Sequence, residues 1–224
     1  MAELILVRHA QASFGTDDYD RLSELGHQQS RWLGEYFAQR GLVFDRVVTG
    51  TLRRHRETLS GLVAGGATVS QSLEHPGLNE YESDRLIKGW LRHTGQSAPS
   101  HGADRREHFR VMRDALSAWV DGSVDFAPHI RFQDFLAGVR AGLELARADT
   151  TARRVLVVSS GGPISTLISD VLGTELRAMV NLNLQMRNAS FSEFHATDKV
   201  VRCVSFNNIP HMDAEPRRSK VTYS

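Results

Sequence analysis

Short apolar runs alternate with longer amphipathic stretches over the first 75 residues. The run at residues 4–7 has four consecutive branched aliphatic side chains, which is typical of a strand buried on both faces of a parallel sheet. An apolar stripe at helical spacing follows at 22–40 and ends at Gly41. The next elements are a strand within 44–49, a helix at 52–64 and a strand at 68–72. This order predicts a βαβαβ unit with a parallel sheet.

The pattern changes between residues 76 and 130 and returns to strands and helices afterwards. Two helical patterns occur at 84–93 and 104–120, and the loop between them is rich in Gly, Ser and Pro. We interpret this stretch as a helical insertion over the carboxyl edge of the sheet, not as a separate domain. A helix, a strand, a helix and two alternating strands follow at 132–148, 155–158, 163–172, 189–195 and 200–206.

These elements predict an α/β fold with a mostly parallel central sheet, helices on both of its faces, and an antiparallel edge. We expect residues 1–209 to form a single domain. Residues 210–224 form a polar, basic tail that we expect to be frayed.

Composition excludes several classes of protein. The 224 residues include 27 basic and 26 acidic side chains, so a net charge of +1 gives no reason to expect nucleic-acid or membrane binding. The single cysteine, Cys203, excludes an intrachain disulfide and a cysteine-based zinc cluster. No apolar stretch approaches the length of a membrane span. We therefore expect a cytoplasmic protein.

Candidate chemical groups follow four of the predicted strands. They are the pair Arg8-His9, the junction 49–54 with Arg54, the loop pair Asn79-Glu80, and the turn 159–162 at the start of a helix. Ligands in open α/β sheets bind beyond the carboxyl ends of the strands. Guanidinium groups, an imidazole, a carboxyl group and a helix N-terminus at one edge suit phosphoryl transfer through a covalent intermediate.

The same segments resemble the histidine phosphatase superfamily, which includes the cofactor-dependent phosphoglycerate mutases. The segment 7–12 resembles the family's opening RHG signature, with Ala10 in the glycine position. The segment 20–29 is similar to D-x-L-[ST]-x-x-G-x-x-Q, and 49–58 is similar to S-x-x-L-x-R-A-x-Q-T. The segment 78–80 matches the one that supplies the family's general acid. The resemblance covers the chain in order, and these four matched segments together are specific.

The resemblance implies a role for each matched residue. His9 would attack phosphorus and become phosphohistidine, while Arg8 and Arg54 would hold the phosphoryl oxygens. Glu80 would protonate the leaving group and then activate water, with Glu82 as the alternative carboxylate. Neither a metal ion nor a cofactor is expected, because the protein supplies the cations itself.

The chain departs from the family pattern at several positions. Ser160 stands where the second active-site histidine belongs, so it would contact phosphate as a neutral donor or simply cap the helix. Gly161 beside it would offer its backbone N–H. His55 occupies a usual alanine position and either points back into the site or is an exposed or hydrogen-bonded helix histidine. A common asparagine is replaced by Gly15, which leaves Gln11 or Ser13 as phosphate donors.

The sequence favours a metal-independent phosphomonoesterase that takes a small phosphorylated substrate or inorganic phosphate. Two alternatives stay open: a weakened or inactive relative that binds a phosphorylated ligand or partner, and a mutase-type phosphotransferase. The turn 159–162 lacks the Gly-Lys-Ser/Thr ending of a nucleotide-binding P-loop. A return to histidine at position 160 is expected to keep or raise turnover.

Overall fold

The computed structural model describes residues 1–13, 20–98, 105–124, 126, 131–175 and 177–223. Its strands are β1 (Ala2–Arg8), β2 (Val43–Phe44), β3 (Arg46–Thr49), β4 (Thr68–Val69), β5 (Ser72–Glu74), β6 (Arg154–Ser159), β7 (Phe191–Ala196) and β8 (Val201–Asn208). Its α-helices are α1 (Glu24–Gln39), α2 (Arg53–Ala64), α3 (Ser83–Thr94), α4 (Arg105–Asp121), α5 (Phe132–Arg147), α6 (Gly161–Leu172) and α7 (Arg177–Gln185). Short 3₁₀ turns lie at Pro76–Leu78, Pro210–Met212 and Arg218–Lys220.

The central sheet confirms the predicted fold class. Six strands lie in the order β5-β3-β6-β1-β7-β8, and the first four run parallel to one another. Strands β7 and β8 form an antiparallel edge. In the register, Arg8 lies opposite Ser159 and Thr49 opposite Val158. The carboxyl ends of β1, β3 and β6 therefore meet at one edge of the sheet.

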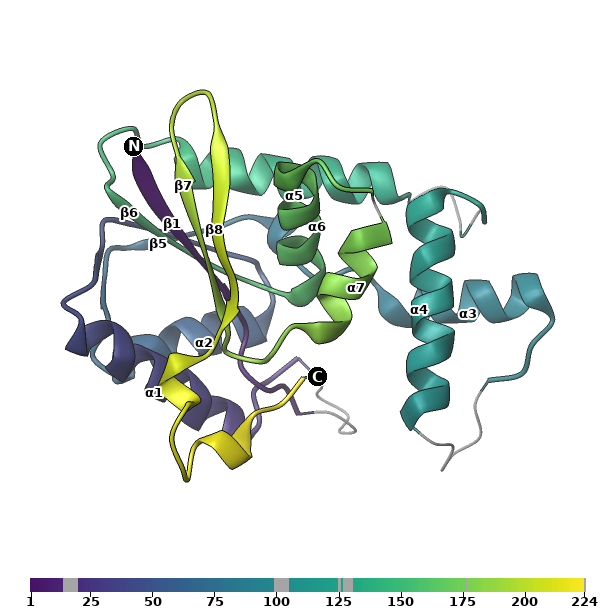
Figure 1. The fold of residues 1–224 in the computed structure, drawn as a ribbon, viewed down its shortest axis with the longest axis horizontal. Coiled ribbons are helices and arrows are strands. Elements are labelled where there is room, and N and C mark those ends of the chain that lie inside the picture. The colour runs from purple at the N-terminus through teal and green to yellow at the C-terminus, as the bar shows by residue number, and fades with distance from the viewer. Residues whose placement is uncertain (14–19, 99–104, 125, 127–130, 176, 224) are drawn as a thin grey trace.

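Helices cover both faces of the sheet because β1 is apolar on both sides. Leu4 and Leu6 pack into a core with α5 and α6, whereas Ile5 and Val7 pack into a second core with α1 and α2 (Figure 1). Alternate side chains of a strand point to opposite faces, so one short run serves both cores. Full burial of each such side chain contributes about 1.5–3 kcal/mol to folding.

Local side-chain contacts shift several predicted boundaries. Helix α1 begins at Glu24, because the Ser23 hydroxyl caps it by accepting from the Gly26 N–H at 3.0 Å. The strand predicted within 44–49 divides at Asp45, whose carboxylate accepts the backbone N–H groups of Arg153 and Arg154 at 2.9 Å each. The strand predicted at 68–72 also divides, since β4 pairs with β2 in a separate two-stranded sheet and β5 joins β3.

The helical insertion extends beyond the carboxyl ends of the parallel strands (Figure 1). Its apolar residues, among them Leu86, Leu116 and Trp119, form a third core with side chains of α5 and α7. The insertion is therefore held by neighbouring helices. Helix α7 was not predicted from the sequence.

The C-terminal tail is packed, so the expectation of fraying is wrong. The side-chain N–H₂ of Gln29 donates to the carbonyl of Lys220 at 2.9 Å and to the hydroxyl of Thr222 at 3.1 Å. Arg217 forms an ion pair with Glu35 at 2.7 Å. Hydrogen bonds and an ion pair hold this polar tail, and the hydrophobic pattern of the sequence does not reveal such contacts.

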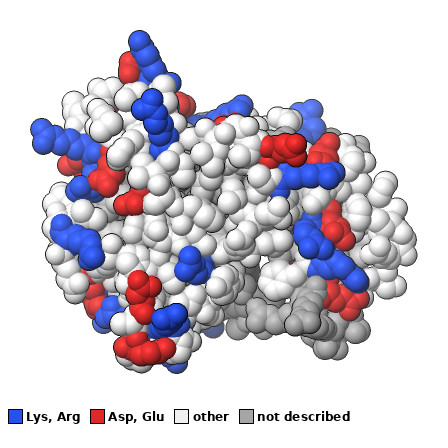
Figure 2. All heavy atoms as spheres, viewed as in Figure 1, with Lys and Arg blue, Asp and Glu red and all other residues white. Residues whose placement is uncertain are grey.

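The surface is mixed in charge. On the face shown in Figure 2, Lys and Arg side chains are interspersed with Asp and Glu, in line with a net charge of +1. Within the described residues, no helix is both long enough and apolar enough to span a bilayer.

Candidate active site

His9 lies immediately after β1 and is 3% exposed. Its backbone N–H donates to the carbonyl of Ser159 at 2.8 Å, which fixes it against the end of β6. The ring Nδ1 lies 2.8 Å from the carbonyl oxygen of Ala10. A carbonyl only accepts hydrogen bonds, so Nδ1 carries the proton and the lone pair of a neutral ring is on Nε2.

The two predicted arginines act on this imidazole. Burial holds the pKa of His9 well below its usual value, and the positive charges of Arg54 and Arg8 lower the pKa further. Arg8 ends β1 and donates to the backbone carbonyls of Met186 and Tyr223. Arg54, in the first turn of α2, donates to the carboxylate of Asp20 at 2.8 Å. Arg8 and Arg54 therefore lie close enough to His9 for their charges to favour a neutral imidazole.

Glu80 approaches the same edge from the loop after β5. Its Oε1 accepts the Gly162 N–H of α6 at 3.0 Å and the Tyr81 N–H at 3.3 Å. Burial raises the pKa of Glu80, against the pull of Arg54, the Gly162 N–H, Arg8 and the Tyr81 N–H. The helix N-terminus thus holds this carboxylate, so part of the anion-binding potential predicted for the turn 159–162 serves Glu80.

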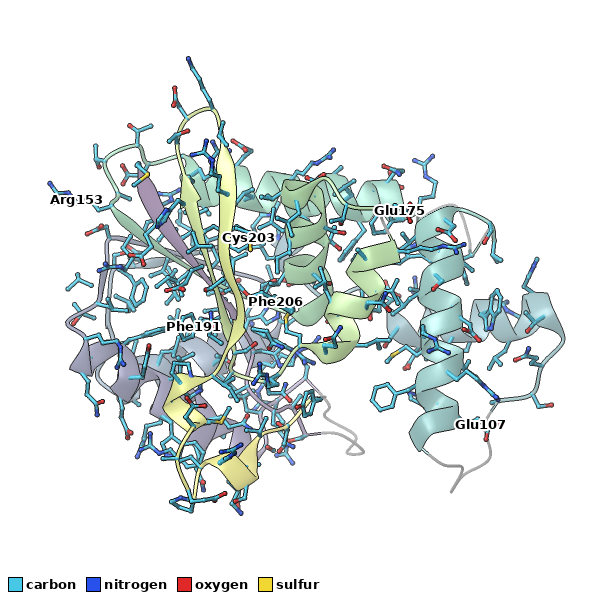
Figure 3. The ribbon with its side chains drawn as sticks, viewed as in Figure 1. Glu107, Arg153, Glu175, Phe191, Cys203 and Phe206 are labelled. Atoms are coloured by element: carbon cyan, nitrogen blue, oxygen red, sulfur yellow. The ribbon has the colours of Figure 1, made fainter. Side chains whose placement is uncertain are left out.

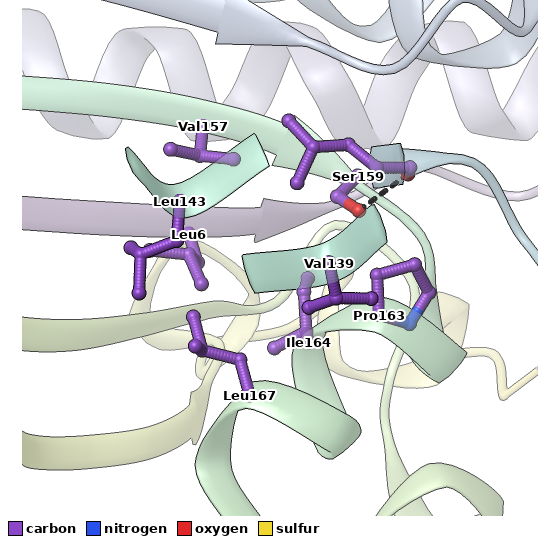
Figure 4. Close-up of a pocket in the computed structure, with 9 residues that line it drawn as sticks. Leu6, Val139, Leu143, Val157, Ser159, Pro163, Ile164 and Leu167 are labelled. Carbon is purple, nitrogen blue, oxygen red and sulfur yellow. Dashed lines mark hydrogen bonds between the residues drawn. The ribbon is translucent and has the colours of Figure 1, made fainter. Parts of the chain in front are cut away.

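The Glu80 loop is tied to the strand ends. The hydroxyl of Ser159 donates to the carbonyl of Leu78 at 2.7 Å, beside a group of apolar side chains from β1, β6, α5 and α6 (Figure 4). The side chain of Asn79 accepts from the Thr51 N–H and donates to the Thr51 hydroxyl, both at 2.7 Å. These bonds fix the position of Glu80 relative to β3 and β6.

The side chain of His55 is buried and points toward Ser160, so it is not exposed. Its Nε2 lies 2.7 Å from the hydroxyl oxygen of Ser160, and both residues are fully buried. The ring centroids of His55 and His9 are 5.8 Å apart. Burial and the nearby Arg54 lower the pKa of His55 to about 3, so its ring is neutral. Ser160 stands at the N-cap position of α6, but its hydroxyl makes no capping hydrogen bond.

Gly161 opens α6 where the backbone runs close to two side chains. A Cβ atom at this position would lie 2.4 Å from Oδ1 of Asn183 and 3.5 Å from Nε of Arg8. Only glycine fits there without displacement of Asn183.

Three of the other candidates have different partners. Oε1 of Gln11 accepts from the Ser23 hydroxyl at 2.7 Å, and the hydroxyl of Ser13 donates to the Leu22 carbonyl at 3.1 Å. Both side chains therefore brace the start of α1. The alternative carboxylate, Glu82, is 55% exposed and pairs with Arg85 at 2.5 Å, which places it outside the site. Gly15 lies outside the described residues.

Thr58 helps to position the candidate site and was not predicted from the sequence. Its hydroxyl accepts the Ala10 N–H at 3.1 Å and donates to the carbonyl of Arg54 at 2.7 Å. One side chain thereby links the His9 loop to the first turn of α2. The signal was present, because this threonine ends the segment 49–58 that is similar to S-x-x-L-x-R-A-x-Q-T.

Two other kinds of site find no support among the described residues. Cys203 lies on the edge strand β8 (Figure 3), and partial burial raises the pKa of its thiol, which disfavours the reactive thiolate. In the described part of the chain, no three His, Cys, Asp or Glu side chains are grouped to hold a metal ion.

Comparisons with known proteins agree with this architecture. A family model of the histidine phosphatase superfamily (branch 1) matches residues 4–209, so the chain belongs to that superfamily. No curated protein matches the chain.

Three solved structures illustrate the fold. A phosphoserine phosphatase variant from Entamoeba histolytica, in complex with phosphoserine, is 20% identical over 95% of this chain and 100% of its own, with a TM-score of 0.62. The α-ribazole phosphatase from Shigella flexneri is 18% identical over 92% and 96%, with a TM-score of 0.62. A phosphoglycerate mutase from Bacillus anthracis str. Sterne is 18% identical over 94% of each chain, also with a TM-score of 0.62. At this identity they show the fold alone.

Proposed function

We propose that this protein is a metal-independent phosphomonoesterase that works through a phosphohistidine on His9. The observation that carries the proposal is the state of the His9 ring. Its proton is held on Nδ1 by the Ala10 carbonyl, and burial and two arginines keep it neutral. A neutral imidazole with its lone pair on Nε2 is a nucleophile at ordinary pH.

Arg8 and Arg54 supply the positive charge for the transferred group. Their planar guanidiniums bind two phosphoryl oxygens each more readily than lysine would. In the transition state, negative charge spreads over the phosphoryl oxygens, and fixed cations in a partly buried site stabilise it strongly. Both arginines are less than a tenth exposed, which favours this role.

Glu80 is the proposed general acid and base. Its raised pKa keeps a larger protonated fraction than a free carboxyl group has, as proton donation to the leaving oxygen requires. After the leaving group departs, the same carboxylate would take a proton from the water that attacks phosphohistidine. The bond from His9 Nε2 to phosphorus forms and then breaks, and phosphate is released.

Small phosphomonoesters are the proposed substrates. The solved neighbours include a phosphoserine phosphatase with bound phosphoserine and another complex with 3-phosphoglyceric acid. A mutase would in addition need to retain the phosphoryl group for a second acceptor. The site offers Glu80 to activate water, so hydrolysis is the better proposal.

A generic aryl phosphate, p-nitrophenyl phosphate, tests the proposal in the presence of excess chelator. His9→Ala should lower turnover by about 10³-fold or more. His195→Ala, which alters an exposed histidine on β7, is the matched control and should leave turnover unchanged. Phosphate binding without turnover by the unaltered protein would favour the binding-only alternative. Loss of activity in chelator would overturn the metal-free mechanism.

A further inference from the structure

The hydrogen bond between His55 and Ser160 joins the start of α2 to the start of α6. The two residues are 105 positions apart and fully buried, and their side chains meet at 2.7 Å. Burial of polar groups is unfavourable unless their hydrogen bonds are satisfied, and a pair of apolar side chains would avoid that requirement. The Ser160 hydroxyl does not serve as a cap for α6 either. The position of this buried polar pair beside His9 favours a functional role.

The pair lies beside the proposed nucleophile, and Ser160 is two residues before the backbone N–H that holds the proposed acid. The His55 ring is 5.8 Å from the His9 ring, centroid to centroid. Ser160 follows Ser159, whose carbonyl accepts the His9 N–H, and precedes the turn in which Gly162 holds Glu80. A hydroxyl at this point lies at the edge where the transferred group would sit.

The proton on His55 fixes the direction of the hydrogen bond. The ring is neutral, so it carries one proton. Nδ1 lies beside the Gly50 backbone, which raises the pKa of the ring slightly, but the contact lacks hydrogen-bond geometry. Nε2 lies 2.7 Å from the Ser160 oxygen. A proton on Nε2 therefore has a better-placed acceptor than a proton on Nδ1 has. Nε2–H donates to the hydroxyl oxygen, and the hydroxyl proton is directed away from His55.

We propose that His55 is a positioning residue that turns the Ser160 hydroxyl into a fixed, neutral hydrogen-bond donor for the phosphoryl group on His9. This inference rests on the proposed function and adds a specific donor to it. A serine rotor without a partner would spend part of its time in unproductive orientations, and its oxygen lone pairs would repel an anion. The His55 N–H occupies one lone pair and leaves the proton for the phosphoryl oxygen.

The same geometry changes the expectation for histidine at position 160. Ser160 is fully buried, and the ring of His55 fills the space beside it. Ser160→His alone would overpack this space and should lower the melting temperature and the turnover. Added removal of the His55 ring, in His55→Ala/Ser160→His, should restore both in part.

Vanadate binding and p-nitrophenyl phosphate turnover test the pair in four proteins: the unaltered chain, His55→Ala, Ser160→Ala and the double alanine variant. Vanadate adopts the five-coordinate geometry of the transferred phosphoryl group. Each single change should lower vanadate affinity and kcat by about 10- to 100-fold, the usual effect of one hydrogen bond to a charged group. The double variant should lose no more than one of the singles, because the two side chains act as a unit.

Ser165→Ala is the matched control, because Ser165 is a fully buried serine of the same helix that donates to the Gly161 carbonyl at 2.7 Å. It should lower the melting temperature without a change in kcat or vanadate affinity. Nitrogen-15 NMR of His55 should find the proton on Nε2, with a signal that shifts in Ser160→Ala and on addition of vanadate.

The possible failures are distinguishable. Additive losses, unchanged vanadate affinity in Ser160→Ala, or a proton on Nδ1 of His55 would overturn the inference while a strong effect of His9→Ala still supported the phosphatase. Full turnover in His9→Ala, or no vanadate binding by the unaltered protein, would overturn the proposed function and this inference together.

Discussion

Charged side chains at the two ends of β1, β3 and β6 lie in opposite environments. At the amino end, Glu3 and Arg154 form an ion pair at 2.6 Å with side chains 30% and 28% exposed, and Asp45 accepts two backbone N–H groups. At the carboxyl end, Arg8 and Arg54 are 8% and 6% exposed, and both act on the buried His9. The charged groups at the amino end are stabilised by solvent and by close partners. The two arginines at the carboxyl end are buried, and their charges converge on His9, which is the arrangement that an anion-binding site requires.

The largest contrast is expected between carboxylates at the two ends. Glu80→Gln should lower kcat about 10²- to 10⁴-fold, the usual range for a lost general acid or base. The loss should be greater for alkyl than for aryl phosphates, because a poor leaving group depends more on protonation. Glu3→Gln should leave kcat unchanged in the same assay. An equal loss of kcat in Glu80→Gln and Glu3→Gln would contradict a special role for the carboxyl end of the sheet.

The arginines provide the next contrast. Arg54→Ala should lower kcat/KM for an aryl phosphate by about 10²- to 10³-fold, since it removes a buried donor to the developing charge. Arg154→Ala removes the same side chain at the amino end and should change kcat/KM less than about twofold. Steady-state kinetics of both variants at saturating and limiting substrate would measure this difference. A strong effect of Arg154→Ala would contradict it.

The pH profile should follow from the two opposite shifts at the carboxyl end. The lowered pKa of His9 means that its protonation removes no activity near pH 6.5. The raised pKa of Glu80 means that the protonated acid is lost only as pH rises through that value, above which kcat/KM falls about tenfold per pH unit. The falling limb should disappear in Glu80→Gln. A rising limb near pH 6.5 that persists in Glu80→Gln, without a matching change in the unfolding data, would contradict the lowered pKa of His9.

Acid should also destabilise the fold through buried histidines. The pKa of His55 and that of His211 are both lowered to about 3, mainly by burial. Between pH 6.5 and about 3 the unfolded chain binds more protons than the folded one, so stability present at neutral pH is lost as pH falls. Each histidine contributes a slope of at most about 1.4 kcal/mol per pH unit. Denaturant unfolding of His211→Leu should show a shallower dependence than exposed His195→Leu.

The smallest effect is expected for the ion pair at the amino end. A double-mutant cycle of Glu3→Gln and Arg154→Ala should give a coupling energy of about 0.2–1 kcal/mol, because both partners are partly solvated. High salt should reduce it further. A coupling of several kcal/mol, measured by urea unfolding, would mean that the amino end carries more of the stability than this comparison allows.

The sequence predicted the sheet and the strand-end residues because each has a local signal. Four consecutive aliphatics mark β1, and Arg8-His9 stands directly after them. Contacts carried by backbone carbonyls have no such signal. The Tyr223 and Lys220 carbonyls hold Arg8 and Gln29, so the packing of the tail was missed.

The direction in which a side chain points could not be predicted from the sequence either. Glu80 and Glu82 are two residues apart, and only the fold decides that one meets the Gly162 N–H while the other pairs with Arg85 in solvent. The His55–Ser160 contact joins two helices across the site. Its distance and direction depend on how α2 and α6 are placed by the sheet. Resemblance to a family identified both positions without showing that they touch.

Chemical trapping of the intermediate tests the central claim most directly. The protein would be mixed with a ³²P-labelled phosphomonoester, denatured within milliseconds in alkali, and digested for peptide mapping. The account predicts an acid-labile, alkali-stable label on His9 that forms and decays at rates compatible with turnover. Turnover without any labelled enzyme, or label on a residue other than His9, would contradict it.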